Sequence, residues 1–130
     1  MTKLRDLEKA MRPQFIWAKF PEKPLQLNEE YEGAKDMARI IFVGIADIHG
    51  FGSAEIMAYL DMEYESYRNK LSRFRQMWRE AKEREKDGCI RMINDIVRRF
   101  YYKVSLCMNY INIHYKQKSY IKMEDWANNE

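Results

Sequence analysis

Residues that interrupt helices are scarce in this sequence. Its 130 residues include three prolines and five glycines, and all three prolines precede residue 25. The rest of the chain is therefore free of proline, the residue that helix interiors tolerate least. Apolar side chains recur there three and four residues apart, which is the period of an amphipathic helix. We predict an all-α fold, a helical bundle in which residues 1–130 form one domain around a single core.

Cysteine is also rare, and long apolar runs are missing. Cys89 and Cys107 lie eighteen positions apart without a metal-binding or redox motif. We therefore expect reduced, buried thiols of a cytoplasmic protein rather than a disulfide framework. No apolar run approaches the roughly 18 residues that a membrane span requires, and no targeting segment is visible. The sequence thus predicts a protein that does not cross a membrane.

Groups that carry enzyme chemistry are few and scattered. The two histidines, His49 and His114, fall on different predicted helices, and neither has neighbours at metal-ligand spacing. The Gly50 and Gly52 pair lacks the preceding strand that phosphate-binding loops require. No nucleophile motif is present. We expect no enzyme activity, no cofactor and no metal; an enzyme of unknown class would instead be marked by a deep pocket with convergent polar groups.

Positive charge is unevenly distributed, although the net charge is only +3. Residues 1–63 hold 8 Lys and Arg against 11 Asp and Glu, whereas residues 64–130 hold 15 against 9. A basic half beside an acidic half favours one oriented face for a polyanion. The alternative is a set of solvated helix faces with mixed ion pairs.

The first third of the chain predicts two helices. Residues 1–12 form a short amphipathic helix, and an extended connector follows over residues 13–24. A second helix begins at Asn28, a favourable N-cap, and ends at Gly50. Its apolar content around residues 40–48 is typical of a central helix that is touched on several sides.

The last third predicts a long C-terminal helix over about residues 89–116, because apolar residues recur there with a 3.6-residue period. The β-branched and aromatic content between Phe100 and Tyr115 leaves a strand as the alternative. Residues 117–130 read as a polar tail, which Trp126 and its neighbours are able to dock as one helical turn.

The most informative stretch is residues 53–79, which predict a helix-turn-helix. Ser53 is placed to cap a short helix that ends near Leu60. A tight break follows, in which Asp61 accepts a left-handed conformation. A second helix begins near Tyr64 and runs on to about Lys86. The apolar positions that pack the two helices together are Ile56, Leu60, Met62, Tyr67, Leu71 and Phe74.

The second of these helices then presents a polar, basic stripe to solvent. Arginine, asparagine and serine side chains reach base edges or phosphates in a major groove. We predict groove contacts from Tyr64, Arg68, Asn69, Ser72 and Arg73, and phosphate contacts from Lys70, Arg75 and Arg79. Ser53, at the start of its helix, is predicted to bind one phosphate through backbone donors. The plainer interpretation is a packing corner, which any helical domain contains.

Three segments in this order resemble one family. They are Ala38-Arg39-Ile40-Ile41, Ser53-Ala54-Glu55-Ile56 and the extension from Arg73-Phe74 to Glu85. Over residues 28–100 the chain resembles the carboxy-terminal DNA-binding domain of the bacterial replication initiator DnaA, a Trp-repressor-like helical fold. The family's reading segment, Gly-Gly-Arg-Asp-His-Thr-Thr-Val, is replaced here by Asp-Met-Glu-Tyr-Glu-Ser-Tyr at residues 61–67. The resemblance therefore implies the fold and DNA binding, but neither that reading site nor initiator activity.

Two functions follow as expectations. The first is a DNA-binding helix-turn-helix protein, of bacterial or phage type, which acts as a regulatory, replication or mobile-element accessory factor on double-stranded DNA. The alternative is a helical protein–protein interaction module that binds a partner, or a second copy of itself, through the tyrosine-rich C-terminal helix. Their responses to salt separate them, because phosphate contacts release counterions and apolar contacts do not.

Overall fold

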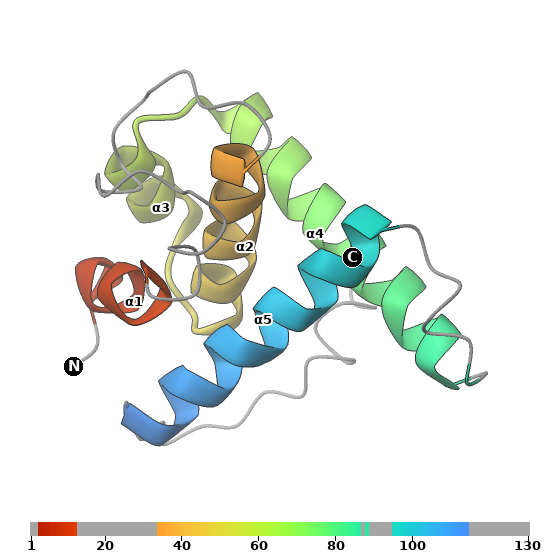
Figure 1. Ribbon diagram of the computed structural model, residues 1–130. Coiled ribbons are helices and arrows are strands. Elements are labelled where there is room, and N and C mark those ends of the chain that lie inside the picture. The colour runs from red at the N-terminus through yellow and green to blue at the C-terminus, as the bar shows by residue number, and fades with distance from the viewer. Residues whose placement is uncertain (1–2, 13–33, 87, 89–94, 115–130) are drawn as a thin grey trace.

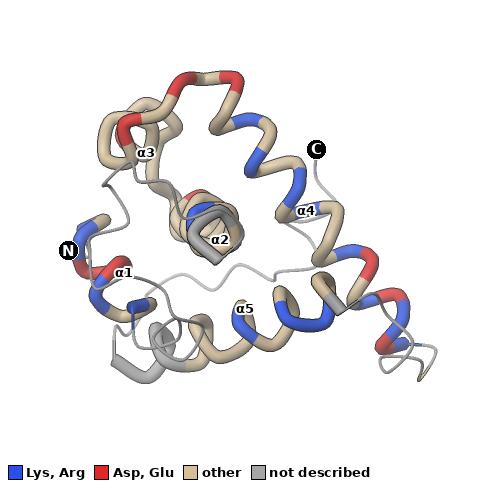
Figure 2. Tube along the Cα trace, turned by 45° about the horizontal axis from the view of Figure 1, so that its top comes forward, with Lys and Arg blue, Asp and Glu red and all other residues tan. Residues whose placement is uncertain are grey.

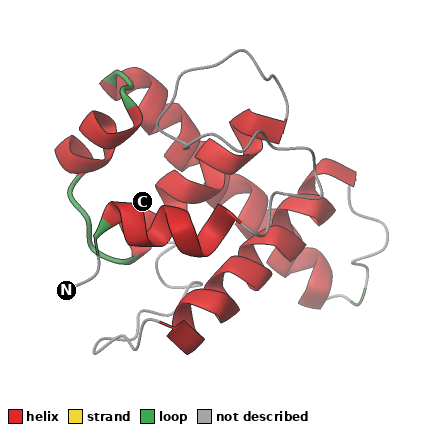
Figure 3. Ribbon diagram, turned by 60° about the vertical axis from the view of Figure 1, so that its left-hand side comes forward, coloured by secondary structure: helices red, strands yellow, loops and turns green. Residues whose placement is uncertain are grey.

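The computed structural model describes residues 3–12, 34–86, 88 and 95–114, and these residues form five packed helices. The helices are α1 (Leu4–Met11), α2 (Ala34–Ile48), α3 (Ser53–Leu60), α4 (Tyr64–Lys86) and α5 (Asp95–His114). Figures 1 and 3 show that this described part of the chain contains helices and connecting turns but no strand. The predicted all-α fold is therefore confirmed. The connector over residues 13–24, the N-cap at Asn28 and the tail over residues 117–130 lie outside the described residues.

Helix α2 is the centre of the fold. Every residue from Ala38 to Ala46 is buried, as is Ile48. A helix that is buried on all sides over several turns must be covered all round by other elements. All four other helices contact α2, and Figure 2, which looks along its axis, shows them arranged around it. The helix ends where Gly50 takes a φ of +87°, as the sequence predicted.

Helix α1 confirms the short amphipathic helix predicted at the start of the chain. Leu4, Leu7, Ala10 and Met11 are buried, and α1 packs against α2 and α5. Their spacing of three, three and one residues places all four on one side of the helix. The opposite side carries Arg5 and Lys9, which are exposed.

The C-terminal segment is helical, so the alternative of a strand is wrong. Val97, Phe100, Val104 and Cys107 recur at the helical period and are all buried. Ile96, by contrast, is 51% exposed, so Val97 provides the core contact at this turn. The predicted first residues of this helix, 89–94, lie outside the described residues. Among the described helices none is long and apolar enough to cross a membrane.

The connection between α3 and α4 follows the prediction almost residue for residue. Helix α3 ends at Leu60, Asp61 takes the left-handed conformation with a φ of 51°, and α4 begins at Tyr64. The amide of Met62 donates to the carbonyl of Met57 over 3.0 Å, and its side chain packs against the core. An aspartate tolerates this backbone conformation better than most residues, which explains the sharp reversal without a glycine.

The predicted N-cap of α3 is wrong by one residue. The carbonyl of Gly52 already accepts the first helical hydrogen bond, from the amide of Ile56 at 3.0 Å, and Gly52 has extended dihedral angles of −70° and 150°. Gly52 is therefore the N-cap, and it makes no side-chain capping bond. Ser53 is the first helical residue and is exposed. A hydroxyl in the first helical position does not reach the amides that an N-cap side chain satisfies.

Candidate nucleic-acid interface

Helix α4 has one buried face, which holds it between α2 and α5. The buried residues of this face are Tyr67, Phe74, Met77, Trp78 and Ala81, which recur at helical spacing. Phe74 meets Phe100 of α5 edge to face, with the ring centroids 4.9 Å apart. Because one stripe of α4 is committed to the core in this way, the stripe opposite is left to solvent.

The groove-contacting residues predicted from the sequence all lie on that exposed side. Tyr64 is 60% exposed, and Arg68, Asn69, Ser72 and Arg73 are exposed as well. They occupy the first half of α4, where Figure 2 shows a succession of basic residues. Within the described part of the chain, Arg68 and Arg73 make no ion pair. The structure thus brings together, on one helix, the two guanidinium groups and the two short polar side chains that the prediction requires.

The three residues predicted to lie nearer phosphates, Lys70, Arg75 and Arg79, are each half-buried. Arg75 pairs with Asp47 near the end of α2, with its Nη2 atom 3.6 Å from Oδ2. The hydroxyl of Tyr67 donates to Oδ1 of the same carboxylate over 3.2 Å. These three residues are here called the Asp47 cluster. Burial, the charge of Asp47 and this hydrogen bond raise the pKa of Tyr67 to about 12.

Ser53, the remaining predicted contact, lies apart from the α4 residues. Ser53 is the first residue of α3, whereas the turn into α4 follows the last residue of that helix, Leu60. The Ser53 side chain is exposed, and Glu55 is exposed two residues later. This carboxylate in the first turn already occupies the positive end of the helix dipole, which is the feature a phosphate would use.

Charge changes sign along α4. Asp61, Glu63 and Glu65 are exposed around its start, where Figure 2 shows acidic residues. From Ser66 to Arg79 the sequence holds five basic residues and no acidic one. The acidic start repels phosphates, whereas the middle attracts them. Any contact between α4 and a polyanion therefore begins at Arg68 and runs toward the C-terminal end.

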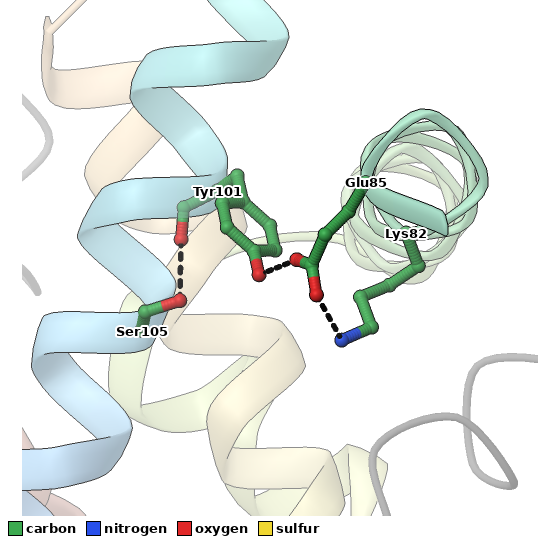
Figure 4. Close-up of polar contacts among 4 residues, drawn as sticks. All are labelled: Lys82, Glu85, Tyr101 and Ser105. Carbon is green, nitrogen blue, oxygen red and sulfur yellow. Dashed lines mark hydrogen bonds and ion pairs between the residues drawn. The ribbon is translucent and has the colours of Figure 1, made fainter. Parts of the chain in front are cut away.

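The C-terminal part of α4 contacts α5 through Glu85 and Trp78. Figure 4 shows that the Glu85 carboxylate accepts a hydrogen bond from the hydroxyl of Tyr101. The same carboxylate forms an ion pair with Lys82, whose Nζ atom lies 3.4 Å from Oε1. The Tyr101 ring stacks on Trp78, with centroids 5.3 Å apart, and Lys82 lies 5.7 Å from the centre of the Trp78 ring. These contacts of Glu85 and Trp78 lie on the C-terminal side of Arg68 and Arg73 along α4.

The described residues include no group of three or more His, Cys, Asp and Glu side chains that is able to hold a metal ion. Cys107 is free and buried, and burial raises its thiol pKa to about 12, so it is protonated at neutral pH. The Nδ1 atom of His49 lies 2.7 Å from the Ile45 carbonyl oxygen, at the end of α2, and burial lowers its pKa.

Asp47 is the site residue that the sequence reasoning missed. A signal for it was available, because an acidic residue in the last turn of a helix faces the negative end of the helix dipole. The last turn of α2 contains no basic residue that would offset it. An acid in that place suggests a cation held nearby by the tertiary fold.

Comparisons with protein-family models, with curated proteins and with solved structures found no match. The resemblance to the DnaA DNA-binding domain therefore remains a prediction carried by the three segments that suggested it.

Proposed function

We propose that this protein binds double-stranded DNA through the exposed side of α4 between Tyr64 and Arg79. The observation that carries the proposal is the exposure of Arg68 and Arg73, with Asn69 and Ser72 between them, on the side of α4 that faces away from the core. These four side chains come from a basic, acid-free stretch of helix. The turn at Asp61 and the short helix α3 correspond to the bracing half of a helix-turn-helix.

The dimensions of α4 support this mode of binding. An α-helix with its side chains is about 10–12 Å wide, which matches a major groove about 12 Å wide. The stretch from Ser66 to Arg79 is about 20 Å long at 1.5 Å per residue. Arginine forms paired hydrogen bonds with guanine, and asparagine does so with adenine. We assign base contacts to Arg68 and Asn69 in this proposal, with Arg73 on the phosphates.

The acidic start of α4 distinguishes this mode from the one that the family resemblance implies. That family reads its site with the first residues of the recognition helix. Here Glu63 and Glu65 stand in that region, and both are exposed. We therefore propose binding by the middle of the helix and propose no role as a replication initiator.

A charge-matched pair of variants tests the proposal. Arg68→Gln with Arg73→Gln removes two cations from the proposed interface. Arg84→Gln with Lys86→Gln removes two exposed cations from the far end of the same helix. Binding to a labelled duplex is measured by fluorescence anisotropy over a salt series. We expect wild-type affinity to fall steeply with salt, with a log–log slope of about −0.9 for each phosphate contacted.

The first pair of substitutions is expected to weaken binding by about 1–3 kcal/mol through the lost base contact of Arg68, and to flatten the slope through the lost phosphate contact of Arg73. The second pair is expected to leave the slope unchanged. Equal losses in both double variants would indicate attraction to net charge alone. Wild-type binding that is absent, or that ignores salt, contradicts the proposal.

Helix α5 supports a second candidate function, that of a protein–protein interaction module. Tyr102 and Leu106, four residues apart and hence on one side of α5, are 51% and 46% exposed. Exposed apolar side chains that lie together are typical of docking surfaces. Substituting Tyr102 and Leu106 by serine would weaken the binding of such a partner protein. It would leave the salt-dependent binding of DNA through α4 unchanged.

A further inference from the structure

The Asp47 cluster lies beside the proposed DNA-binding face and contains one of its cations. On α4, Arg68, Arg75 and Arg79 are separated by seven and four residues, so they project from the same side of the helix. Arg68 is exposed, whereas the Arg75 side chain is only 16% exposed. The middle arginine of this row is therefore more covered than Arg68, and it is paired with Asp47.

The two oxygens of Asp47 are both engaged across the junction of α2 and α4. Oδ1 accepts from the Tyr67 hydroxyl, and Oδ2 lies 3.6 Å from the Arg75 guanidinium. One carboxylate oxygen, Oδ2, thus faces Arg75 with the kind of negative charge that a DNA phosphate oxygen carries. The Asp47 side chain is 25% exposed, so the pair lies at the rim of the interface rather than in the core.

Helix stability does not account for the acid at this place. Asp47 is the second-last residue of α2, where its negative charge faces the negative end of the helix dipole. Exposed or rim ion pairs add little to folding stability. A residue that opposes its own helix, and that is held by a partly exposed ion pair and a hydrogen bond from Tyr67, is the kind of local conflict expected near functional sites.

We infer that Asp47 masks Arg75 by standing in for a phosphate, and so limits the number of phosphates that α4 contacts. This inference rests on the proposed function. Asp47 acts through Arg75 and is a positioning residue rather than a DNA contact. Removing the charge of Asp47 should therefore strengthen binding to DNA, although Asp47 itself does not contact the DNA.

Asp47→Asn is the decisive variant. It keeps an oxygen that is able to accept from Tyr67 but removes the charge that holds Arg75. We expect the log–log salt slope on duplex DNA to become steeper by about 0.9, the contribution of one more phosphate. Between 50 and 200 mM salt, the affinity advantage of the variant over the wild type should consequently shrink by about threefold.

The change in net charge is controlled in two ways. Glu83→Gln makes the same change at an exposed position near the far end of α4 and should leave the slope unaltered. In an Arg75→Gln background, Asp47→Asn should no longer alter the slope, because the cation to be released is gone. A steeper slope that persists in that background overturns the inference, since it would then reflect net charge alone.

The arginine variants give a reading that does not depend on the folding of Asp47→Asn. In the otherwise wild-type protein, Arg75→Gln should leave the slope nearly unchanged, whereas Arg73→Gln, which removes the proposed phosphate contact, should reduce it by about 0.9. Equal reductions show that Arg75 already contacts a phosphate and overturn the masking by Asp47 while the proposed function stands. Absence of salt-dependent binding by the wild type overturns both.

Discussion

Gly44 sets how closely α2 and α4 approach each other. It lies in the middle of α2, among residues that are all buried. A methyl group built on its Cα would lie 2.3 Å from Cδ2 of Phe74 and 2.5 Å from two more atoms of that ring. Because real side-chain atoms do not approach so closely, only a glycine lets the Phe74 ring lie on the α2 backbone. A glycine inside a long apolar helix is itself a sign of close packing.

We predict that Gly44→Ala destabilises the protein, although alanine is the better helix former by about 1 kcal/mol. Forcing an extra methyl group into a packed core costs about 1–3 kcal/mol, which outweighs that gain when three ring atoms are in the way. Chemical denaturation followed by circular dichroism measures the change. The loss should be smaller when Phe74→Leu is also present. Stabilisation by Gly44→Ala alone would falsify the close approach.

The role of Asp61 could be predicted from its neighbours in the sequence, whereas the role of Asp47 could not. Asp61 was predicted to take a left-handed conformation from its residue type and place, and its φ of 51° confirms this. The role of Asp47 was not predictable in this way, because its partners are 20 and 28 positions away on α4. The difference is physical, since a turn is determined locally and an ion pair between helices is not.

Helix α1, which packs against α2 and α5, also makes a buried polar contact with α3. Glu8 is only 6% exposed, and its Oε1 atom accepts a hydrogen bond of 2.8 Å from the hydroxyl of Tyr59. Arg12 lies 3.8 Å from its other oxygen. The Tyr59 ring also stacks on Phe42 of α2, with centroids 5.6 Å apart. This tyrosine therefore joins three helices through one side chain.

We predict that Tyr59→Phe lowers the free energy of unfolding by about 1–3 kcal/mol, the usual effect of leaving a buried charged group without one of its hydrogen bonds. The stack on Phe42 is preserved, so the loss reports on Glu8. Tyr102→Phe is the matched control. It removes the same atom from a side chain that is 51% exposed, and its effect should stay within about 0.5 kcal/mol. Similar effects of the two substitutions would contradict the tether between α1 and α3.

Helix boundaries were predictable where strong local signals coincide. The end of α3 at Leu60, the start of α4 at Tyr64 and its end at Lys86 all agree with the sequence. The N-cap of α3 was misassigned to Ser53 because a serine before an apolar run is the stronger composition signal. In the structure Gly52 is the N-cap, because this residue, in the turn after α2, has the extended backbone that an N-cap requires.

At the scale of the whole molecule, the core holds acids whose protons are hard to remove. Burial raises the pKa of Cys107 on α5 from 9.0 to about 12, against the opposing charge of Lys103. The pKa of Tyr67 on α4 is raised from 10.0 to about 12. The unfolded chain releases these protons at lower pH than the native protein does. The stability that they contribute is therefore complete below about pH 9 and is lost as pH rises toward 12.

We predict that the free energy of unfolding falls as pH rises above 9 and that Cys107→Ala flattens this decline between pH 9 and 12. Tyr67→Phe should flatten it from pH 10 upward. Lys103 acts in the opposite direction, because burial lowers its pKa, so each group is judged by comparing its variant with the wild type. Urea denaturation at closely spaced pH values is the measurement. Parallel profiles for Cys107→Ala and the wild type would rule out the buried thiol as a cause.

The sequence by itself determined the helical class, the reversal at Asp61 and the basic character of α4, because each depends on residue type and on spacing within a few positions. Only the tertiary structure decided which of the arginines on α4 are exposed. Arg68 and Arg73 face solvent, whereas Arg75 meets Asp47, because α2 and α4 pack closely where Gly44 admits the Phe74 ring. Such packing brings together residues that are far apart in the chain, so the local sequence pattern does not predict it.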